Sequence, residues 1–167
     1  MVHKIEVRRV DPERDSQDIA RLIQICRMER RTVVDRYTAE EEKIFLENLH
    51  SRDGAFVAHV DGKFAGFASV SLRWHYSERL QHCGEGATWI LPEFRHKGVG
   101  TTLWRKGILP WCQKVGFKHI GFFVMAQNKT AIAFYERLGF RVCGYHRRLV
   151  KWDEEYLDAV EMEIWIE

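Results

Sequence analysis

The sequence is poor in features that would assign it to several large protein classes. Its 26 lysines and arginines nearly balance 24 aspartates and glutamates, so the net charge of +2 provides no general attraction to nucleic acid or anionic membranes. The longest apolar run, Ile120 to Ala126, is far shorter than the about 20 residues of a membrane-spanning helix. The first residues contain no hydrophobic signal region. We therefore expect a cytoplasmic protein that binds neither nucleic acid nor membranes.

Common metal-binding and nucleotide-binding motifs are also missing. The four cysteines form no CxxC pair and the eight histidines form no HExxH motif, so we expect free thiols and no metal. A dinucleotide fingerprint that starts at Gly98 would need glycine or alanine at position 103, which is Leu103. The only Gly-Lys pair is Gly62-Lys63, and Phe64 follows it where a P-loop needs serine or threonine.

What the sequence does contain is a series of strand-like segments. Alternating or continuous apolar residues predict strands over 3–10, 55–60, 63–72, 85–91, 119–126, 140–145 and 159–166. Asp61-Gly62 between two of these segments is typical of a two-residue hairpin turn. The continuous apolar segment 119–126 is expected to be buried on both faces of a sheet.

Helical spacing of apolar residues predicts four helices between these strands. One follows a cap at Asp15 or Ser16, and another follows Thr38, which forms a capping box with Glu41. The others cover 99–115, where Pro110 should kink or restart the helix, and 130–138. Helices and strands in this mixed order indicate an α/β or α+β sheet domain.

The junction between the strand 85–91 and the following helix has an unusual composition. Arg95, His96 and Lys97 stand in a row, and Gly98 and Gly100 follow. A helix start exposes unpaired N–H groups and partial positive charge, and glycines let a ligand approach the backbone. The junction therefore predicts a phosphate-binding corner, with three basic side chains that add charge. The alternative is a solvated loop in which the glycines only allow the turn.

Three motifs in order resemble the GNAT acyltransferase superfamily, whose members bind acetyl-CoA. They are the strand end with Pro-x-x-Arg-x-x-Gly-x-Gly from Pro92, an asparagine after the next strand (Asn128), and AIAFYERLGF over 131–140. The resemblance spans roughly residues 55–145. It implies that 1–167 is a single acetyltransferase domain, with a mixed, mostly antiparallel central sheet flanked by helices and a splayed pair of parallel strands.

The resemblance also implies acetyl-CoA as the cosubstrate and suggests which residues bind it. Amides of the corner would hold the pyrophosphate, backbone groups of the preceding strand would pair with the pantetheine arm, and Asn128 would bond to that arm. Ala131 and Phe134 would lie near the thiol end. The corner residues are Arg95, His96, Lys97, Gly98, Val99, Gly100 and Thr101, and the strand residues are Trp89, Ile90 and Leu91.

Two residues are candidates for proton transfer. Tyr135 would lie near the sulfur, where a phenol with a pKa of about 10 stays protonated at neutral pH and can donate to the departing thiolate. The alternative is that Tyr135 is only a packing aromatic. Glu85 starts the strand before the corner and could accept the proton of the amine, with His75 and His82 as weaker candidates. Because Cys83 has no obvious activating partner, we expect direct attack of the amine on the thioester.

The sequence leaves the acceptor amine undetermined. Small amines and protein or peptide amines are both open, and segments 73–84 and 27–37 are candidate walls of the acceptor site. An excess of arginine in 27–36 would suit an acidic acceptor. A catalytically inactive, CoA-binding regulatory domain is the alternative function, and the oligomeric state is open, with a homodimer among the candidates.

Overall fold

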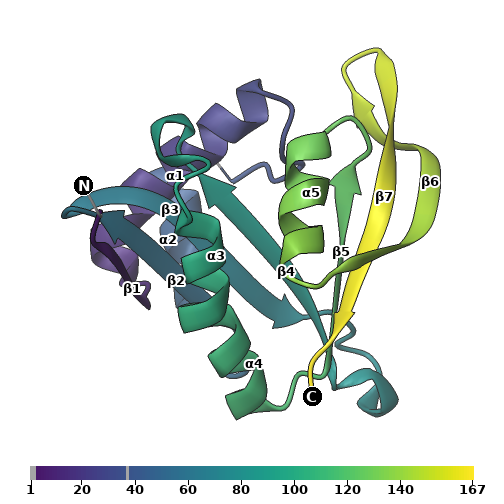
Figure 1. Cartoon of the computed structure of the whole chain (residues 1–167), viewed down its shortest axis with the longest axis horizontal. Helices are drawn as coiled ribbons and strands as arrows, with labels where there is room; N and C mark the ends of the chain where they lie inside the picture. The colour runs from purple at the N-terminus through teal and green to yellow at the C-terminus, as the bar shows by residue number, and fades with distance from the viewer. Residues whose placement is uncertain (1–2, 37) are drawn as a thin grey trace.

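The computed structural model describes residues 3–36 and 38–167, which form one seven-stranded sheet with helices on both faces (Figure 1). The strand order is β1-β2-β3-β4-β5-β7-β6. Every neighbouring pair is antiparallel except β4 and β5, which run parallel, so the predicted mixed sheet is confirmed. The strands are β1 (Ile5–Arg9), β2 (Gly54–Val60), β3 (Lys63–Leu72), β4 (Cys83–Ile90), β5 (His119–Met125), β6 (Arg141–Trp152) and β7 (Glu155–Trp165).

The parallel pair β4–β5 is the feature that positions the site. The two strands share only three residue pairs, which end at Glu85 opposite Gly121. Beyond this point β4 continues to Ile90 and β5 to Met125 without pairing to each other, and Figure 1 shows them diverging. We call this opening the fork. It leaves one backbone edge of each strand without a partner strand, as the resemblance implied.

The helices cover the sheet in two groups. Helices α1 (Pro12–Met28) and α2 (Ala39–Glu47) bury Ile19, Ile23 and Leu46 against Phe67 and Trp89 on one face. The other face carries α5 (Lys129–Arg137) and a continuous helix made of α3 (Val99–Leu103), a π-helical turn (Trp104–Ile108) and α4 (Leu109–Val115). Short 3₁₀ turns occur at Glu78–Leu80 and Pro92–Phe94.

Most predicted helix signals are confirmed, with one correction. Thr38 and Glu41 form the capping box, and the π-helical turn directly precedes Pro110, whose missing N–H cannot continue a regular helix. The cap of α1, however, is Asp11, which accepts from the amide of Glu13 at 3.1 Å. The prediction of Asp15 or Ser16 as the cap was wrong because Pro12, a favoured first helical residue, already starts the helix.

The strands also follow the predictions, except on the C-terminal side. Asp61 and Gly62 have φ values of 48° and 80°, as a type I′ hairpin turn requires. The predicted strands 140–145 and 159–166 overlap the much longer hairpin β6–β7. The middle of this hairpin was not predicted because its residues are mostly charged and exposed, so they lack the apolar alternation by which a half-buried strand is identified. β5 is largely buried on both faces, as predicted, with the exception of Phe123, which is 44% exposed.

Candidate active site

A cavity of about 1070 Å³ occupies the fork. Both diverging strands line it, from Glu85 to Ile90 on β4 and from Phe122 to Met125 on β5. Nearly all residues predicted for the site meet here; they are Glu85, Trp89, Ile90, Arg95, His96, Gly98, Val99, Gly100, Thr101, Asn128, Ala131, Phe134 and Tyr135. Leu91 and Lys97 do not line the cavity. The structure therefore places the sequence candidates together, while their roles stay predictions.

The corner after β4 has the geometry of an anion-binding helix start. Gly98 is the N-cap residue, with a left-handed φ of 80° and no side-chain cap. The first-turn amides of Val99, Gly100 and Thr101 consequently have no partner within the helix and line the cavity. A Cβ at Gly98 would meet nothing within 4 Å, whereas one at Gly100 would lie 2.8 Å from Cζ of Phe134. Gly100 thus allows α3 to pack against α5, in addition to any ligand approach.

Of the three basic residues of the corner, Arg95 is engaged elsewhere. The guanidinium of Arg95 donates to the carboxylate of Glu29 at 2.6 and 3.1 Å and to the carbonyl of Ile90 at 3.1 Å. Lys97 is exposed, with its ammonium 5.7 Å from the ring centroid of Phe94. The expectation that all three side chains add charge was wrong, because Arg95 ties the corner to the end of α1.

The strand register corrects which backbone groups of β4 face the fork. The N–H of Leu91 donates to Ala65 at 2.9 Å on the β3 side, and its carbonyl accepts from Phe94 at 2.9 Å. Backbone groups of successive strand residues point to alternate sides, so Trp89 also faces β3. Ile90 and Thr88 face the fork instead. The prediction of Trp89 and Leu91 as backbone partners of the pantetheine arm was therefore wrong, and that of Ile90 agrees with the geometry.

Tyr135 lies in an aromatic cluster on the helix α5 side of the fork. It is 5% exposed, and its ring centroid lies 4.4 Å from that of Phe122 and 4.8 Å from that of Phe134. Burial raises the pKa of Tyr135 to about 12, although a hydrogen bond with the hydroxyl of Thr88 acts in the opposite direction. Thr88 in turn accepts from the indole of Trp104 at 2.7 Å. The phenol is therefore protonated at neutral pH and can act as a donor, and it is also a packing aromatic.

Asn128, at the start of α5, lines the cavity beside this cluster. Its side-chain oxygen accepts from the amide of Ala131 at 3.2 Å and so caps the helix. Its amide nitrogen donates to no atom of residues 3–36 or 38–167, which leaves this donor available toward the cavity.

Glu85 approaches the fork from the opposite face of the sheet. Gly86 faces Trp104, and alternation places Glu85 with Trp89 on the side of α1 and α2. Glu85 is exposed to solvent, but partial desolvation by the surrounding protein still raises the pKa of its carboxyl; the guanidinium of Arg73 lowers this pKa, and the carboxylate of Glu161 raises it. The carboxylate of Glu85 and the phenol of Tyr135 thus line the fork from opposite faces of the sheet.

The remaining wall of the cavity lies on the side of Glu85. Segment 27–37 contributes as predicted, through Arg31, Thr32, Val33, Val34 and Arg36, while Tyr37 is outside the described residues. No residue of 73–84 lines the cavity, so neither His75 nor His82 is placed there. Sequence reasoning missed several other wall residues, among them Phe45 on α2, Ser69 and Ser71 on β3, Phe123 on β5, and Leu149 and Val150 on β6.

The arginines of segment 27–36 lie beside acidic groups of the same chain. Arg27 lies 3.4 Å from Asp35, Arg30 2.5 Å from Glu155, Arg31 3.3 Å from Glu29 and Arg36 3.2 Å from Glu42. These internal partners reduce the local charge excess on which the expectation of an acidic acceptor rested, although Glu29 is shared between Arg31 and Arg95.

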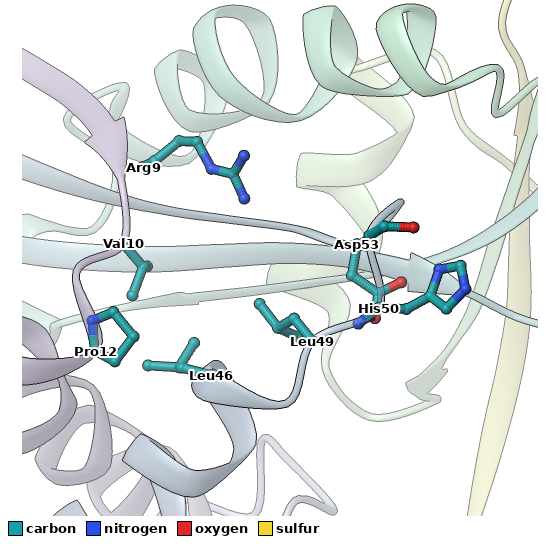
Figure 2. Close-up of a pocket in the computed structure, with 8 residues that line it drawn as sticks. Arg9, Val10, Pro12, Leu46, Leu49, His50 and Asp53 are labelled. Carbon is teal, nitrogen blue, oxygen red and sulfur yellow. Dashed lines mark hydrogen bonds between the residues drawn. The ribbon is translucent and has the colours of Figure 1, made fainter.

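A second, smaller cavity of about 510 Å³ lies between β1, the end of α2 and the turn before β2 (Figure 2). Its acidic group is already engaged, because the buried carboxylate of Asp53 accepts from the amides of His50 at 3.1 Å and Leu72 at 2.9 Å. Arg9 on the opposite wall stacks over Trp111 at 4.1 Å. Asp53 and Arg9 are therefore engaged within the protein, whereas the first-turn amides of Val99, Gly100 and Thr101 at the fork have no partner within their helix.

Over residues 3–36 and 38–167, no group of three or more His, Cys, Asp and Glu side chains could hold a metal ion. In the same part of the chain, no helix combines the length and the apolar composition that crossing a membrane requires.

Comparisons with known proteins place this geometry among acetyltransferases. Residues 19–140 match the model of the acetyltransferase (GNAT) family. An uncharacterized N-acetyltransferase of Methanocaldococcus jannaschii is 37% identical over 89 residues, which cover 53% of this chain and 39% of that protein. An N-alpha-acetyltransferase of Saccharolobus solfataricus is 30% identical over 127 residues, which cover 71% of this chain and 73% of the relative.

The chain spans only part of some of these relatives. It covers 39% of the Methanocaldococcus jannaschii protein and 62% of an N-alpha-acetyltransferase from Sulfurisphaera tokodaii.

Solved structures show the same fold. A GNAT-family acetyltransferase from Streptococcus pneumoniae superimposes with a TM-score of 0.83 at 23% identity, over 98% of this chain and 100% of the other. A putative acetyltransferase from Salmonella typhimurium, solved with its cofactor acetyl-CoA, gives a TM-score of 0.88 at 18% identity, over 98% and 95%.

Proposed function

Because the chain belongs to the GNAT acetyltransferase family, we propose that it is an acetyl-CoA-dependent N-acetyltransferase whose reaction takes place in the fork between β4 and β5. The observation that carries this proposal is the fork itself, which exposes an unpaired strand edge between an anion-binding corner and a buried phenol. We also propose that residues 1–167 form one acetyltransferase domain, since a single sheet runs through the described chain.

The residues of the fork fit acetyl-CoA as cosubstrate, which would supply the thioester. The first-turn amides at Val99, Gly100 and Thr101 would bind the pyrophosphate. Backbone groups of Thr88 and the N–H of Ile90, whose carbonyl already accepts from Arg95 at 3.1 Å, would hydrogen-bond the pantetheine arm in the manner of an added strand, and Asn128 would donate its side-chain amide to the same arm. These contacts would hold the thioester between Glu85 and Tyr135.

Direct transfer requires two proton movements, which the two sides of the fork can provide. Glu85 would take a proton from the ammonium of the acceptor, and the raised pKa of its carboxyl makes it a better base than an ordinary glutamate. As the new N–C bond forms and the C–S bond breaks, Tyr135 would give its phenolic proton to the leaving thiolate. No covalent enzyme intermediate is required.

The proposal is tested by measuring CoA release from acetyl-CoA with a broad panel of primary amines and peptides. We expect Tyr135→Phe to lower kcat by about 10²–10⁴-fold, the usual contribution of one general acid, with little change in the Kd for CoA. The ring of Phe keeps the aromatic packing, so Tm serves as the control for folding. Tight CoA binding without turnover of any amine would favour the alternative of an inactive regulatory domain. An unchanged kcat would remove Tyr135 from the mechanism.

A further inference from the structure

Arg73, which follows β3, has a buried guanidinium outside the cavity. Its side chain is 8% exposed, and its Nη2 donates to Oε1 of Glu161 on β7 at 2.7 Å. Its backbone amide donates to the carbonyl of Cys83 at 3.1 Å, which fixes the start of the side chain at the edge of β4. The side chain therefore runs from the β1–β4 half of the sheet to the β5–β7 half.

The path of this side chain crosses the sheet at the point where the fork begins. A Cβ at Gly121 would lie 2.5 Å from Nη1 of Arg73, so any larger residue there would displace the guanidinium. Gly121 pairs with Glu85 in the last residue pair between β4 and β5. The Arg73–Glu161 ion pair thus joins the two halves of the sheet at the position where their own hydrogen bonds end.

Aromatic rings hold the guanidinium in this position. Its Cζ lies 4.9 Å from the ring centroid of Trp74 and 5.6 Å from that of Phe123, within the range of cation–π attraction. An apolar pair could fill the same space with similar stability, so the distinctive contribution of an ion pair here is its orientation and its charge.

Both members of the pair act electrostatically on Glu85, and they act in opposite directions. Arg73 lowers the pKa of Glu85 and Glu161 raises it, while burial raises it most. Other titratable groups come from each neighbouring element; they are Cys83 on β4, His119 on β5, Arg141 and His146 on β6, Glu163 on β7, and Arg31 and Arg36 after α1. Glu163 is already engaged by His119 at 3.0 Å and by Arg141 at 2.7 Å.

We propose that Arg73 and Glu161 form a brace across the fork, which holds the strand ends and the Glu85 carboxylate in place relative to the reacting thioester. The inference rests on the proposed function. Both are positioning residues, because neither lines the cavity and each acts through Glu85 and the strands around it.

The test compares Arg73→Gln and Glu161→Gln with a matched control, Arg141→Gln. The control removes an arginine of β6 that pairs with Glu163, which lies on β7 like Glu161. The side chain of Arg141 is 80% exposed, whereas that of Arg73 is 8% exposed. The first readout is direct titration of the Glu85 carboxyl by NMR with labelled glutamate, assigned with Glu85→Gln. We expect the titration to move to higher pH in Arg73→Gln, to lower pH in Glu161→Gln, and to stay in place in Arg141→Gln.

The second readout is kinetic and uses an acceptor found in the amine panel. We expect Gly121→Ala, which displaces the guanidinium but removes no charge, to lower kcat by up to about 100-fold, the effect of misplacing reacting groups by about 1 Å. The brace is refuted if folded Arg73→Gln and Glu161→Gln shift the titration in the same direction or leave it unchanged. Glu161→Gln alone decides the question should Arg73→Gln not fold.

The NMR titration needs no turnover, so it separates this inference from the proposed function. Opposite shifts in a protein that acetylates no amine would support the brace and count against the enzyme. Turnover with an unmoved Glu85 titration would support the enzyme and refute the brace.

Discussion

The packing of Gly100 against Phe134 leads to a quantitative prediction about the corner. In Gly100→Ala the new Cβ would lie 2.8 Å from Cζ and 3.0 Å from Cε2 of Phe134, closer than any normal contact. Overpacking of this kind typically costs about 1–3 kcal/mol. For a chain of 167 residues this corresponds to a loss of roughly 2–12 °C in Tm.

The same displacement should reach the donor site. Phe134 contacts Tyr135 with ring centroids 4.8 Å apart, and both line the cavity. We therefore expect Gly100→Ala to lower kcat and to weaken CoA binding together, whereas Gly98→Ala, with open space at its Cβ, should lose only about 1–2 kcal/mol from its left-handed φ of 80°.

Thermal melting, calorimetry with CoA and steady-state kinetics measure these effects. The decisive variant is the double substitution Gly100→Ala/Phe134→Leu, because the smaller side chain provides the missing space. We expect Gly100→Ala to lower the Tm of the Phe134→Leu variant much less than it lowers the Tm of the wild type. If Gly100→Ala melts and binds CoA like the wild type, or if Phe134→Leu recovers nothing, the packing argument is wrong.

Three further predictions follow from other contacts. Glu85→Gln should lower kcat/KM by about 100-fold or more. In the wild type, activity should fall with decreasing pH as the Glu85 carboxylate becomes protonated, and the fall should occur at a higher pH than for an ordinary glutamate because the pKa of Glu85 is raised; a pH–rate profile checks this. Burial raises the pKa of Asp15, but hydrogen bonds from Arg8 and the amide of Asp11 outweigh burial and keep this pKa low. Asp15→Asn should therefore lower the free energy of unfolding by about 2 kcal/mol or more at neutral pH. The difference from wild type should shrink as the pH falls through the lowered pKa of Asp15, as denaturant titration at several pH values can show. Leu149→Ala should widen the acceptor cavity and improve kcat/KM for bulkier amines, while small amines should react at an unchanged rate.

Features that depend on neighbouring residues were predictable from the sequence. The Thr38–Glu41 capping box, the Asp61-Gly62 turn and the helix start at Gly98 all appear as expected. Each is a local arrangement in which the side chain or backbone freedom of one residue satisfies groups within about four positions. The N-cap of α1 was predicted wrongly because Asp11, Asp15 and Ser16 can all cap a helix, and only the position of Pro12 as the first helical residue favours Asp11.

Contacts between distant segments were not predictable in the same way. The direction of the Arg95 side chain depends on Glu29, which is distant in sequence but lies at the end of α1 beside the corner. The assignment of Trp89 and Leu91 to the cofactor failed because the register with β3 decides which backbone groups are already bonded. A shift of one residue would reverse that assignment, and no local pattern reports it.

The sequence by itself determined the local structure of the corner. Pro92 to Thr101 form the expected turn and helix start because these features depend on residues close together in the chain, whereas the roles of Asn128 and Tyr135 stay predictions from the family resemblance. Only the tertiary structure decided how the fork is held and what faces the acceptor. Arg73 and Glu161 meet across β4 and β5, and segment 31–36 lines the same cavity as the β6–β7 hairpin, because strand pairing brings together groups that no short-range periodicity relates.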